Sequence, residues 1–170
     1  EGISLAEYVF RFEDKDIKTY LQQVYLVMQE AINRGISTAG VLPGPLKVER
    51  KAPYLYNKII VNEPPEIKES RLVSSYAFAV SEENASGGII VTAPTCGACG
   101  VLPSVLYYMA EKYSFITKER IINALAVAGL IGNLIKTNAS ISGAVCGCQA
   151  EIGSACSMAA AAHATLLKLN

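Results

Sequence analysis

Apolar residues recur along the chain mainly at the spacing of an α-helix. Near the N-terminus they fall three, four and seven positions apart, which places them on one helical face: Ile17, Tyr20, Leu21, Val24, Met28, Ala31 and Ile32. Ser4 and Glu7 have the spacing of a capping box, so a short helix is expected to begin at Ser4. Gly35 lies where a left-handed C-terminal cap would end the longer helix.

Turn-forming residues interrupt this helical pattern in the middle of the chain. Residues 41–46 contain two prolines and a glycine, which disfavour a helix and a central strand and therefore predict a loop. Residues 47–66 are mixed in character and predict a long irregular connection. Helical spacing returns over residues 70–83 and ends before a pair of glycines. The β-branched residues 89–92 follow and predict a short strand or an extended segment.

Three more helices are predicted in the second half of the chain. One runs from residue 102 or 103 to 113, and the next, with Thr117 as its N-cap, covers residues 118–135. A polar, turn-prone loop is expected over residues 136–143, and the alanine-rich residues 154–169 predict a last helix packed on all sides. The pattern therefore predicts a mainly α, multi-helix compact domain with Gly-rich loops between helices and at most one short strand.

The composition fits a single globular domain that covers residues 1–170. Apolar residues make up 51% of the chain, and 15 lysines and arginines balance 15 aspartates and glutamates. Because this balance provides no bulk electrostatic attraction, we expect neither a nucleic-acid partner nor a membrane partner. The apolar stretch 121–135 is shorter than the roughly 20 residues that a membrane-spanning helix requires, and we interpret it as a buried core helix.

The cysteines and the two chain ends suggest where the protein resides and how much of it this sequence represents. Five cysteines are an odd number for a disulfide framework, and the first residues lack the pattern of a signal peptide, so a reducing cytoplasm is expected. The chain begins without methionine and stops inside an apolar, helix-like run. We therefore expect it to be a piece of a longer protein.

Cys96 and Cys99 form a Cys-x-x-Cys pair that is compatible with three kinds of chemistry. The open interpretations are a redox dithiol, half of a zinc or iron-sulfur site, and two buried thiols. No alternation of strands and helices surrounds the pair, which disfavours a thioredoxin-like dithiol. A zinc site needs a second pair, which Cys146 and Cys148 with Cys156 provide only loosely. Individually, Cys96, Cys146 and Cys156 are interpreted as buried core thiols.

Two other segments carry candidate binding groups. Lys136, Asn138 and Ser140 are polar residues between apolar helices, where their side chains need partners in the loop or in a ligand. Cys148 lies between Gly147 and Gln149, and the backbone N–H groups of such a turn favour a thiolate that binds an iron-sulfur cluster. Helices follow both Gly-rich loops, and their free N–H groups attract a carboxylate or phosphate. The single histidine, His163, is interpreted as a surface or packed side chain rather than a catalytic base.

Several motifs point together to one family. Residues 91–106 read VTAPTCGACGVLPSVL, and they are followed in order by KTNASISGA, GCQ and CSMAA at residues 136–144, 147–149 and 156–160. GVLPGPL at residues 40–46, EENA at 82–85 and the glycine pair at 87–88 extend the pattern toward the N-terminus. These segments closely resemble the α domain, or α subunit, of bacterial iron-sulfur L-serine dehydratases, and the resemblance covers nearly the whole chain.

The resemblance implies an L-serine ammonia-lyase that converts L-serine to pyruvate and ammonia with a 4Fe-4S cluster. Three cysteines hold the cluster in that family. Cys148 matches the first of them, and the other two belong to CDPV-type and VPC-type segments downstream of this chain. As our own hypothesis, we expect the substrate-binding groups to come from the Gly-rich turn and from the polar loop: Thr95, Gly97, Lys136, Asn138 and Ser140.

The same resemblance defines what the chain lacks. The chain corresponds to the N-terminal two-thirds of an α domain and is expected to be inactive alone. We expect the catalytic base to lie on a β domain or β subunit of the same enzyme. The complete enzyme is expected to be a homo-oligomer. Val145 stands where many relatives have glutamate, Cys96 where asparagine is common, and Cys99 where some have alanine. Two alternatives stay open: a non-catalytic helical interaction domain, and a small zinc-stabilised module with core cysteines.

Overall fold

The structure, a computed structural model, describes residues 2–169. These residues form helices that follow one another along the chain as α1 (Leu5–Phe12), α2 (Ile17–Ser37), α3 (Ala52–Asn57), α4 (Pro65–Ala85), α5 (Val101–Lys112), α6 (Lys118–Asn138) and α7 (Gly143–Leu166). The only β-type pairing among them is a single antiparallel bridge between Val41 and Glu49. The mainly α fold class is thereby confirmed, and residues 89–92 are an extended segment rather than a strand.

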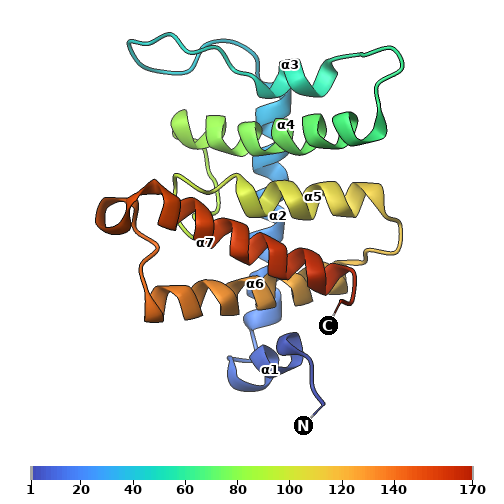
Figure 1. The fold of residues 1–170 in the computed structure, drawn as a ribbon, viewed down its shortest axis with the longest axis vertical. Coiled ribbons are helices and arrows are strands. Elements are labelled where there is room, and N and C mark those ends of the chain that lie inside the picture. The colour runs from blue at the N-terminus through green and yellow to red at the C-terminus, as the bar shows by residue number, and fades with distance from the viewer. Residues whose placement is uncertain (1, 170) are drawn as a thin grey trace.

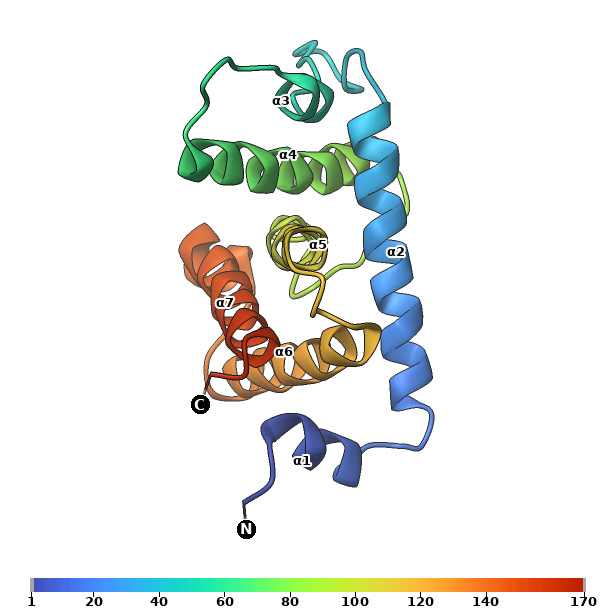
Figure 2. The same cartoon turned by 90° about the vertical axis from the view of Figure 1, so that its right-hand side faces the viewer.

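The helices are stacked along α2. Figure 1 shows α4, α5 and α6 lying across α2 one after another, with α3 beyond α4 at one end and α1 beyond α6 at the other. Figure 2 shows that α7 lies on the far side of α5 and α6 from α2. The molecule is therefore three layers deep around its middle, and α5 is enclosed between α2 and α7.

Two of the predicted helix starts are confirmed by their caps. The backbone N–H of Ser4 donates to Glu7 Oε2 at 2.7 Å, and the N–H of Glu7 donates to Ser4 Oγ at 3.2 Å, which is a complete capping box at α1. The N–H of Arg120 donates to Thr117 Oγ1 at 3.3 Å at the start of α6. Each cap satisfies a backbone donor that the helix itself cannot pair, which typically contributes about 1 kcal/mol.

The predicted end of α2 is wrong, because Gly35 lies inside the helix, which continues to Ser37. A Cβ on Gly35 would lie 2.5 Å from the carbonyl oxygen of Ala79 in α4 and 2.6 Å from its Cα. The glycine therefore permits two helix backbones to cross in close contact, rather than providing a left-handed cap.

The connection 47–66 is also more ordered than predicted, since it contains α3. The carboxylate of Glu82, in α4, accepts hydrogen bonds from the backbone N–H groups of Lys51 at 2.5 Å and Ala52 at 3.4 Å. Ser75 Oγ donates to the carbonyl oxygen of Ala52 at 2.9 Å. The first turn of α3 is thus capped by a helix that follows it in sequence, a contact that no local pattern reveals.

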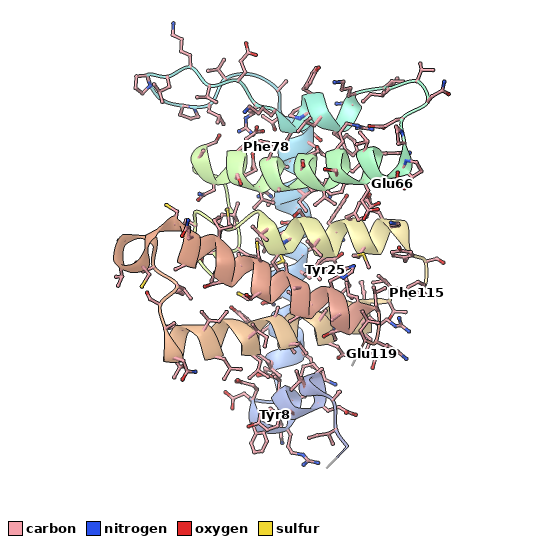
Figure 3. All side chains as sticks on the ribbon, in the orientation of Figure 1. Tyr8, Tyr25, Glu66, Phe78, Phe115 and Glu119 are labelled. Atoms are coloured by element: carbon pink, nitrogen blue, oxygen red, sulfur yellow. The ribbon has the colours of Figure 1, made fainter. Side chains whose placement is uncertain are left out.

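The hydrophobic core has a larger and a smaller part. The larger part joins residues of α2, α5, α6 and α7, among them Met28, Leu106, Leu125 and Leu166, and the smaller part joins α2 and α4 around Ile32 and Tyr76. Tyr25 lies near the middle of the molecule, whereas Tyr8 and Phe115 lie at its margin (Figure 3). Burial raises the pKa of the Tyr25 phenol to about 12.

α6 is long and apolar enough to cross a membrane by length and composition alone. In this structure it packs against α1, α2 and α7, and its buried residues include Ile121, Ile122, Leu125 and Val127. This packing agrees with the expected core helix.

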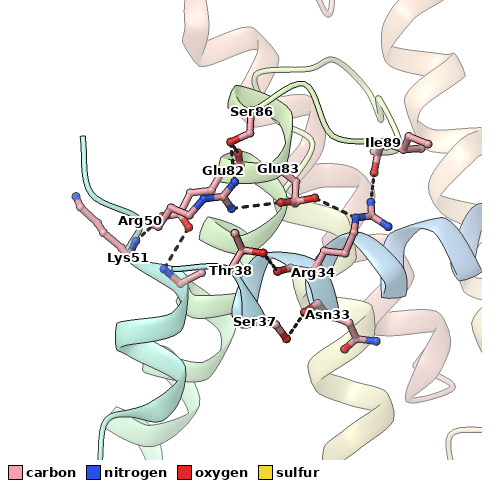
Figure 4. Close-up of polar contacts among 11 residues, drawn as sticks. Asn33, Arg34, Ser37, Thr38, Arg50, Lys51, Glu82, Glu83, Ser86 and Ile89 are labelled. Carbon is pink, nitrogen blue, oxygen red and sulfur yellow. Dashed lines mark hydrogen bonds and ion pairs between the residues drawn. The ribbon is translucent and has the colours of Figure 1, made fainter. Parts of the chain in front are cut away.

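A buried ionic network fixes the segment that follows α4 (Figure 4). Glu83 pairs with Arg34 of α2 at 3.0 Å and with Arg50 at 3.2 Å. Arg34 Nη2 also donates to the carbonyl oxygen of Ile89 at 2.6 Å, and Arg50 Nη2 donates to Ser86 Oγ at 2.7 Å. Because the Glu83 and Arg50 side chains are buried, each charge depends on the other for compensation. The network ties the chain leaving α4 to α2 and so directs it toward α5.

Candidate functional site

The Gly-rich turn 95–100 is anchored on α4 immediately before α5 begins. Asn84 Nδ2 donates to the carbonyl oxygen of Cys96 at 3.2 Å. A Cβ on Gly100 would lie 2.5 Å from the carbonyl oxygen of Ala77 and 3.0 Å from Ser81 Oγ. Glycine at this position therefore allows the turn to lie directly against the α4 backbone.

Glu151, in α7, lies against the other side of this turn. Thr95 Oγ1 donates a hydrogen bond to Glu151 Oε1. A Cβ on Gly97 would lie 2.6 Å from Glu151 Oε1, and a Cβ on Gly143 would lie 2.8 Å from Oε2. The carboxylate thus occupies the space between the turn and the first residue of α7, and this space exists because both neighbouring residues lack side chains.

A kink in α7 places Cys148 beside the same site. Gly147 has φ 78° and ψ 165°, a conformation that residues with a Cβ rarely adopt. Cys148 follows immediately, its thiol is free and exposed, and its Cα would lie 4.0 Å from a Cβ on Gly143. Cys148 and Glu151 are three positions apart in the helix beyond the kink, so both side chains extend toward the same face of α7.

The predicted substrate-binding residues fall into two groups in the structure. Thr95 and Gly97 meet at Glu151. Lys136 and Asn138 lie in the last turn of α6 rather than in the expected loop; Lys136 is exposed, and Asn138 Nδ2 donates to the Leu134 carbonyl at 2.8 Å. The predicted end of this helix, residue 135, is too early, because the polar side chains that follow are typical of a loop. In the structure the Asn138 side-chain amide instead forms a hydrogen bond within α6.

Ser140 lies in the short connection between α6 and α7. Its Oγ accepts a hydrogen bond from the backbone N–H of Ser142 at 3.1 Å. Within residues 2–169, no hydrogen bond or ion pair joins Lys136, Asn138 or Ser140 to the turn 95–100. Their binding roles stay predictions.

Solvent exposure corrects the interpretation of most of the cysteines. Cys96, Cys146 and Cys156 are exposed, so the expectation that they are core thiols is wrong. Cys96 lies in an exposed turn, Cys146 lies beside the kink of α7, and Cys156 lines an open groove beside α7, so none of these three thiols is enclosed in the core. Cys99 is the buried member of the Cys-x-x-Cys pair, and burial raises the pKa of its thiol to about 11. A raised pKa is the opposite of what an activated dithiol requires.

Metal-ligand geometry is limited within the part of the chain that the structure describes. No group of three or more His, Cys, Asp or Glu side chains there could hold a metal ion. One exposed thiol at Cys148, held by a glycine kink, fits the position of a single cluster ligand among several. The described residues therefore offer at most one ligand of a cluster at this place, and the iron-sulfur assignment of Cys148 stays a prediction.

A groove lies between α4, α5 and α7. This groove has a volume of about 370 Å³, and its lining includes Val73, Val105, Met109, Cys156 and His163. His163 is half-buried there, in agreement with its interpretation as a packed side chain. The groove is mainly apolar and lies away from Glu151, which is not part of its lining.

The turn has backbone groups that can attract an anion. The N–H groups of Cys96 and Gly97, two exposed residues, have no hydrogen-bond acceptor among the described residues. Such groups attract a carboxylate. Thr95 has a single hydroxyl proton, and because Glu151 accepts it, Thr95 cannot donate to a ligand at the same time.

Sequence reasoning missed Glu151. The signal for it was a charged residue within an otherwise small and apolar segment, Ala150 to Ala155, three positions after Cys148. A carboxylate in such surroundings needs a specific partner. The local pattern could not identify that partner, because Thr95 is 56 positions away in the sequence.

Comparisons with known proteins identify the family of the chain. The family model for the serine dehydratase alpha chain matches residues 2–170. The L-serine dehydratase of Haemophilus influenzae is 49% identical over 156 residues, which cover 89% of this chain and 34% of that protein. L-serine dehydratase 1 of Escherichia coli is 44% identical over 171 residues, covering 98% and 37% of the two chains.

A third relative shows the same partial overlap. The L-serine dehydratase of Streptomyces coelicolor is 45% identical over 161 residues, which are 95% of this chain and 35% of that protein. The chain thus covers little more than a third of the length of these curated relatives, while the family model spans almost all of the chain. The chain belongs to the serine dehydratase alpha chain family.

Proposed function

We propose that the protein containing this chain is an L-serine ammonia-lyase that converts L-serine to pyruvate and ammonia. The observation that carries the proposal is the meeting of two family-like segments at one place, where the turn at Thr95 contacts α7 beside Cys148 through Glu151. The names of the relatives, all L-serine dehydratases, support the substrate and the reaction.

Cys148 is proposed as one of three cysteine ligands of a 4Fe-4S cluster, the other two being supplied by chain outside these 170 residues. When bound, a cluster with one iron not held by cysteine supplies a Lewis acid that assists departure of the serine hydroxyl as water. The kink at Gly147 directs the thiol toward solvent beside the turn, where a cluster and a substrate would both have access.

The residues of this chain bind and orient the substrate in this proposal. The N–H groups of Cys96 and Gly97 hold the substrate carboxylate, and the close contact of Gly100 with α4, together with the hydrogen bond from Asn84 to Cys96, keeps the turn rigid. Lys136, Asn138 and Ser140 would contribute further polar contacts.

The remaining steps need a base. Removal of the α-proton and loss of water give aminoacrylate, which tautomerises and is hydrolysed to pyruvate and ammonia. None of the groups at the site in this chain is assigned this role, so the base is proposed to belong to a companion β domain or β subunit. The chain alone is therefore proposed to be inactive and, in the complete enzyme, to act in the cytoplasm as part of a homo-oligomer.

Replacing Cys148 tests this function in the complete protein. The Cys148→Ser variant, reconstituted anaerobically with iron and sulfide, is expected to lose its cluster absorbance and its pyruvate formation from L-serine together. Cys156→Ser is the matched control, because Cys156 is also an exposed thiol of α7 but has no assigned ligand role. Retention of a full cluster and full activity in Cys148→Ser would refute the assignment.

A further inference from the structure

Glu151 carries a charge that the described residues do not neutralise. The carboxylate is half-buried, and its one hydrogen-bond donor is the Thr95 hydroxyl. The ion pairs identified within residues 2–169 include carboxylates of Glu30, Glu63, Glu69 and Glu83, and none of these pairs includes Glu151. A carboxylate can accept about four hydrogen bonds, so most of its acceptor capacity is unused. A partly buried anion of this kind is stabilised by a cationic ligand.

The backbones of two glycines lie close to the carboxylate. Both Gly97 and Gly143 lie so close to it that a single Cβ at either position would overlap an Oε atom, at 2.6 Å and 2.8 Å respectively. Because both residues are glycines, neither has a side chain that covers the carboxylate oxygens. Gly97 is exposed, so the turn is accessible from solvent at this residue.

The turn presents opposite polarities within a few residues. The unpaired N–H groups of Cys96 and Gly97 attract an anion, whereas Glu151, held by the side chain of Thr95, attracts a cation. An α-amino acid carries its carboxylate and its ammonium on the same carbon. The oxygen of Thr95 still has lone pairs while its proton is donated to Glu151, so it can accept one N–H of that ammonium.

We infer that Glu151 binds the α-ammonium group of the substrate and thereby selects an α-amino acid over the corresponding carboxylic acid without an amino group. This inference rests on the proposed function, because it places the substrate at the turn. It deepens that function by giving a specificity role to a residue that the resemblance did not assign.

The test uses the complete enzyme and two inhibitors that differ only in the ammonium group. L-alanine and propanoate are titrated as competitors of L-serine in the wild-type enzyme and in Glu151→Gln. The inhibition constant of L-alanine is expected to rise at least about tenfold in the variant, while that of propanoate changes less than about twofold. Glu151→Asp, which keeps the charge, is expected to retain preference for L-alanine.

A matched control and a folding check accompany these measurements. Glu119→Gln removes an exposed carboxylate at the far end of α6, well away from the turn (Figure 3), and should change neither inhibition constant. Iron and sulfide content and helical circular dichroism show whether Glu151→Gln is folded and loaded. If it is not, the comparison of Glu151→Asp with wild type decides: loss of its preference for L-alanine overturns the inference.

Other outcomes contradict the inference in distinguishable ways. Equal weakening of L-alanine and propanoate would show that Glu151 only shapes the turn. Unchanged inhibition constants with a loss of kcat of about a thousandfold or more would show a proton-transfer group instead. A wild-type enzyme that forms no pyruvate from L-serine would refute the proposed function itself, before any variant is compared.

Discussion

At the scale of single residues, exposure separates Cys99 from the other cysteines. Cys99 is 1% exposed and packs with Ile32, Tyr76 and Val80 between α2 and α4. Desolvation is the main cause that raises the pKa of its thiol to about 11, and the charges of Cys96 and Glu151 act in the same direction. The neutral thiol is therefore the form present near neutral pH.

This difference predicts selective alkylation of the native chain. At pH 8 only about one Cys99 thiol in a thousand is ionised, because each pH unit below the pKa reduces the thiolate fraction tenfold. Cys99 should react with iodoacetamide at least about a hundredfold more slowly than the exposed Cys96, and its rate should rise as the pH approaches 11.

Mass spectrometry of the alkylated peptides measures both rates in one sample. Unfolding in urea is the control, because it exposes both thiols and returns the pKa of Cys99 to about 8.5, so the rates should become similar. Equal rates of Cys96 and Cys99 in the native chain would contradict the burial on which the prediction depends.

At the scale of elements, the crossing of α2 and α4 depends on one glycine. An added Cβ at Gly35 would meet the backbone of Ala79, which cannot rotate away as a side chain can. The Gly35→Ala variant is therefore expected to lower the free energy of unfolding by about 1–3 kcal/mol, although alanine favours the helix by about 1 kcal/mol. Urea titration of the chain, followed by circular dichroism, measures the change.

Gly153 supplies the opposite case. It lies in α7 with no heavy atom within 4 Å of an added Cβ. The Gly153→Ala variant should raise the free energy of unfolding by up to about 1 kcal/mol, because only the helix propensity changes. If both variants shifted in the same direction, the close contact at Gly35 would not be the cause.

These elements also show which structural features a local sequence pattern can predict and which it cannot. The capping box at Ser4 and the cap at Thr117 were predictable because donor and acceptor are three residues apart. α3 was not, since its first turn is capped by Glu82 from the next helix. Gly35 was assigned to a cap for the same reason: its function depends on α4, which a sequence pattern in α2 does not contain.

At the scale of the whole molecule, the candidate site is assembled by tertiary packing. Cys148 and the Gly-rich turn were identified from the sequence by family resemblance, which is specific to short motifs. Glu151, which joins the turn to α7, was not identified, because its contact with Thr95 depends on α7 packing against α5. Lys136 and Asn138 were expected in a loop because polar side chains are typical of loops. The sequence pattern does not show that α6 continues to Asn138.

The arrangement along α2 predicts that stability varies from the middle of the molecule to its ends. α1 lies at one end, packs on α6 and has only Ala6 buried, whereas the middle of α6 is enclosed by α2 and α7 (Figures 1 and 2). α1 can therefore separate from the body while exposing little apolar surface, but the centre of α6 cannot exchange its amides unless most of the core opens.

Amide hydrogen exchange of the chain, followed by mass spectrometry, tests this gradient. Peptides from α1 should have protection factors at least about a hundredfold lower than peptides covering Ile121 to Ala128 of α6. The capping box does not change this expectation, because a single cap contributes only about 1 kcal/mol. Equal protection of α1 and α6 would mean that α1 opens only with the whole core, which its shallow packing on α6 does not explain.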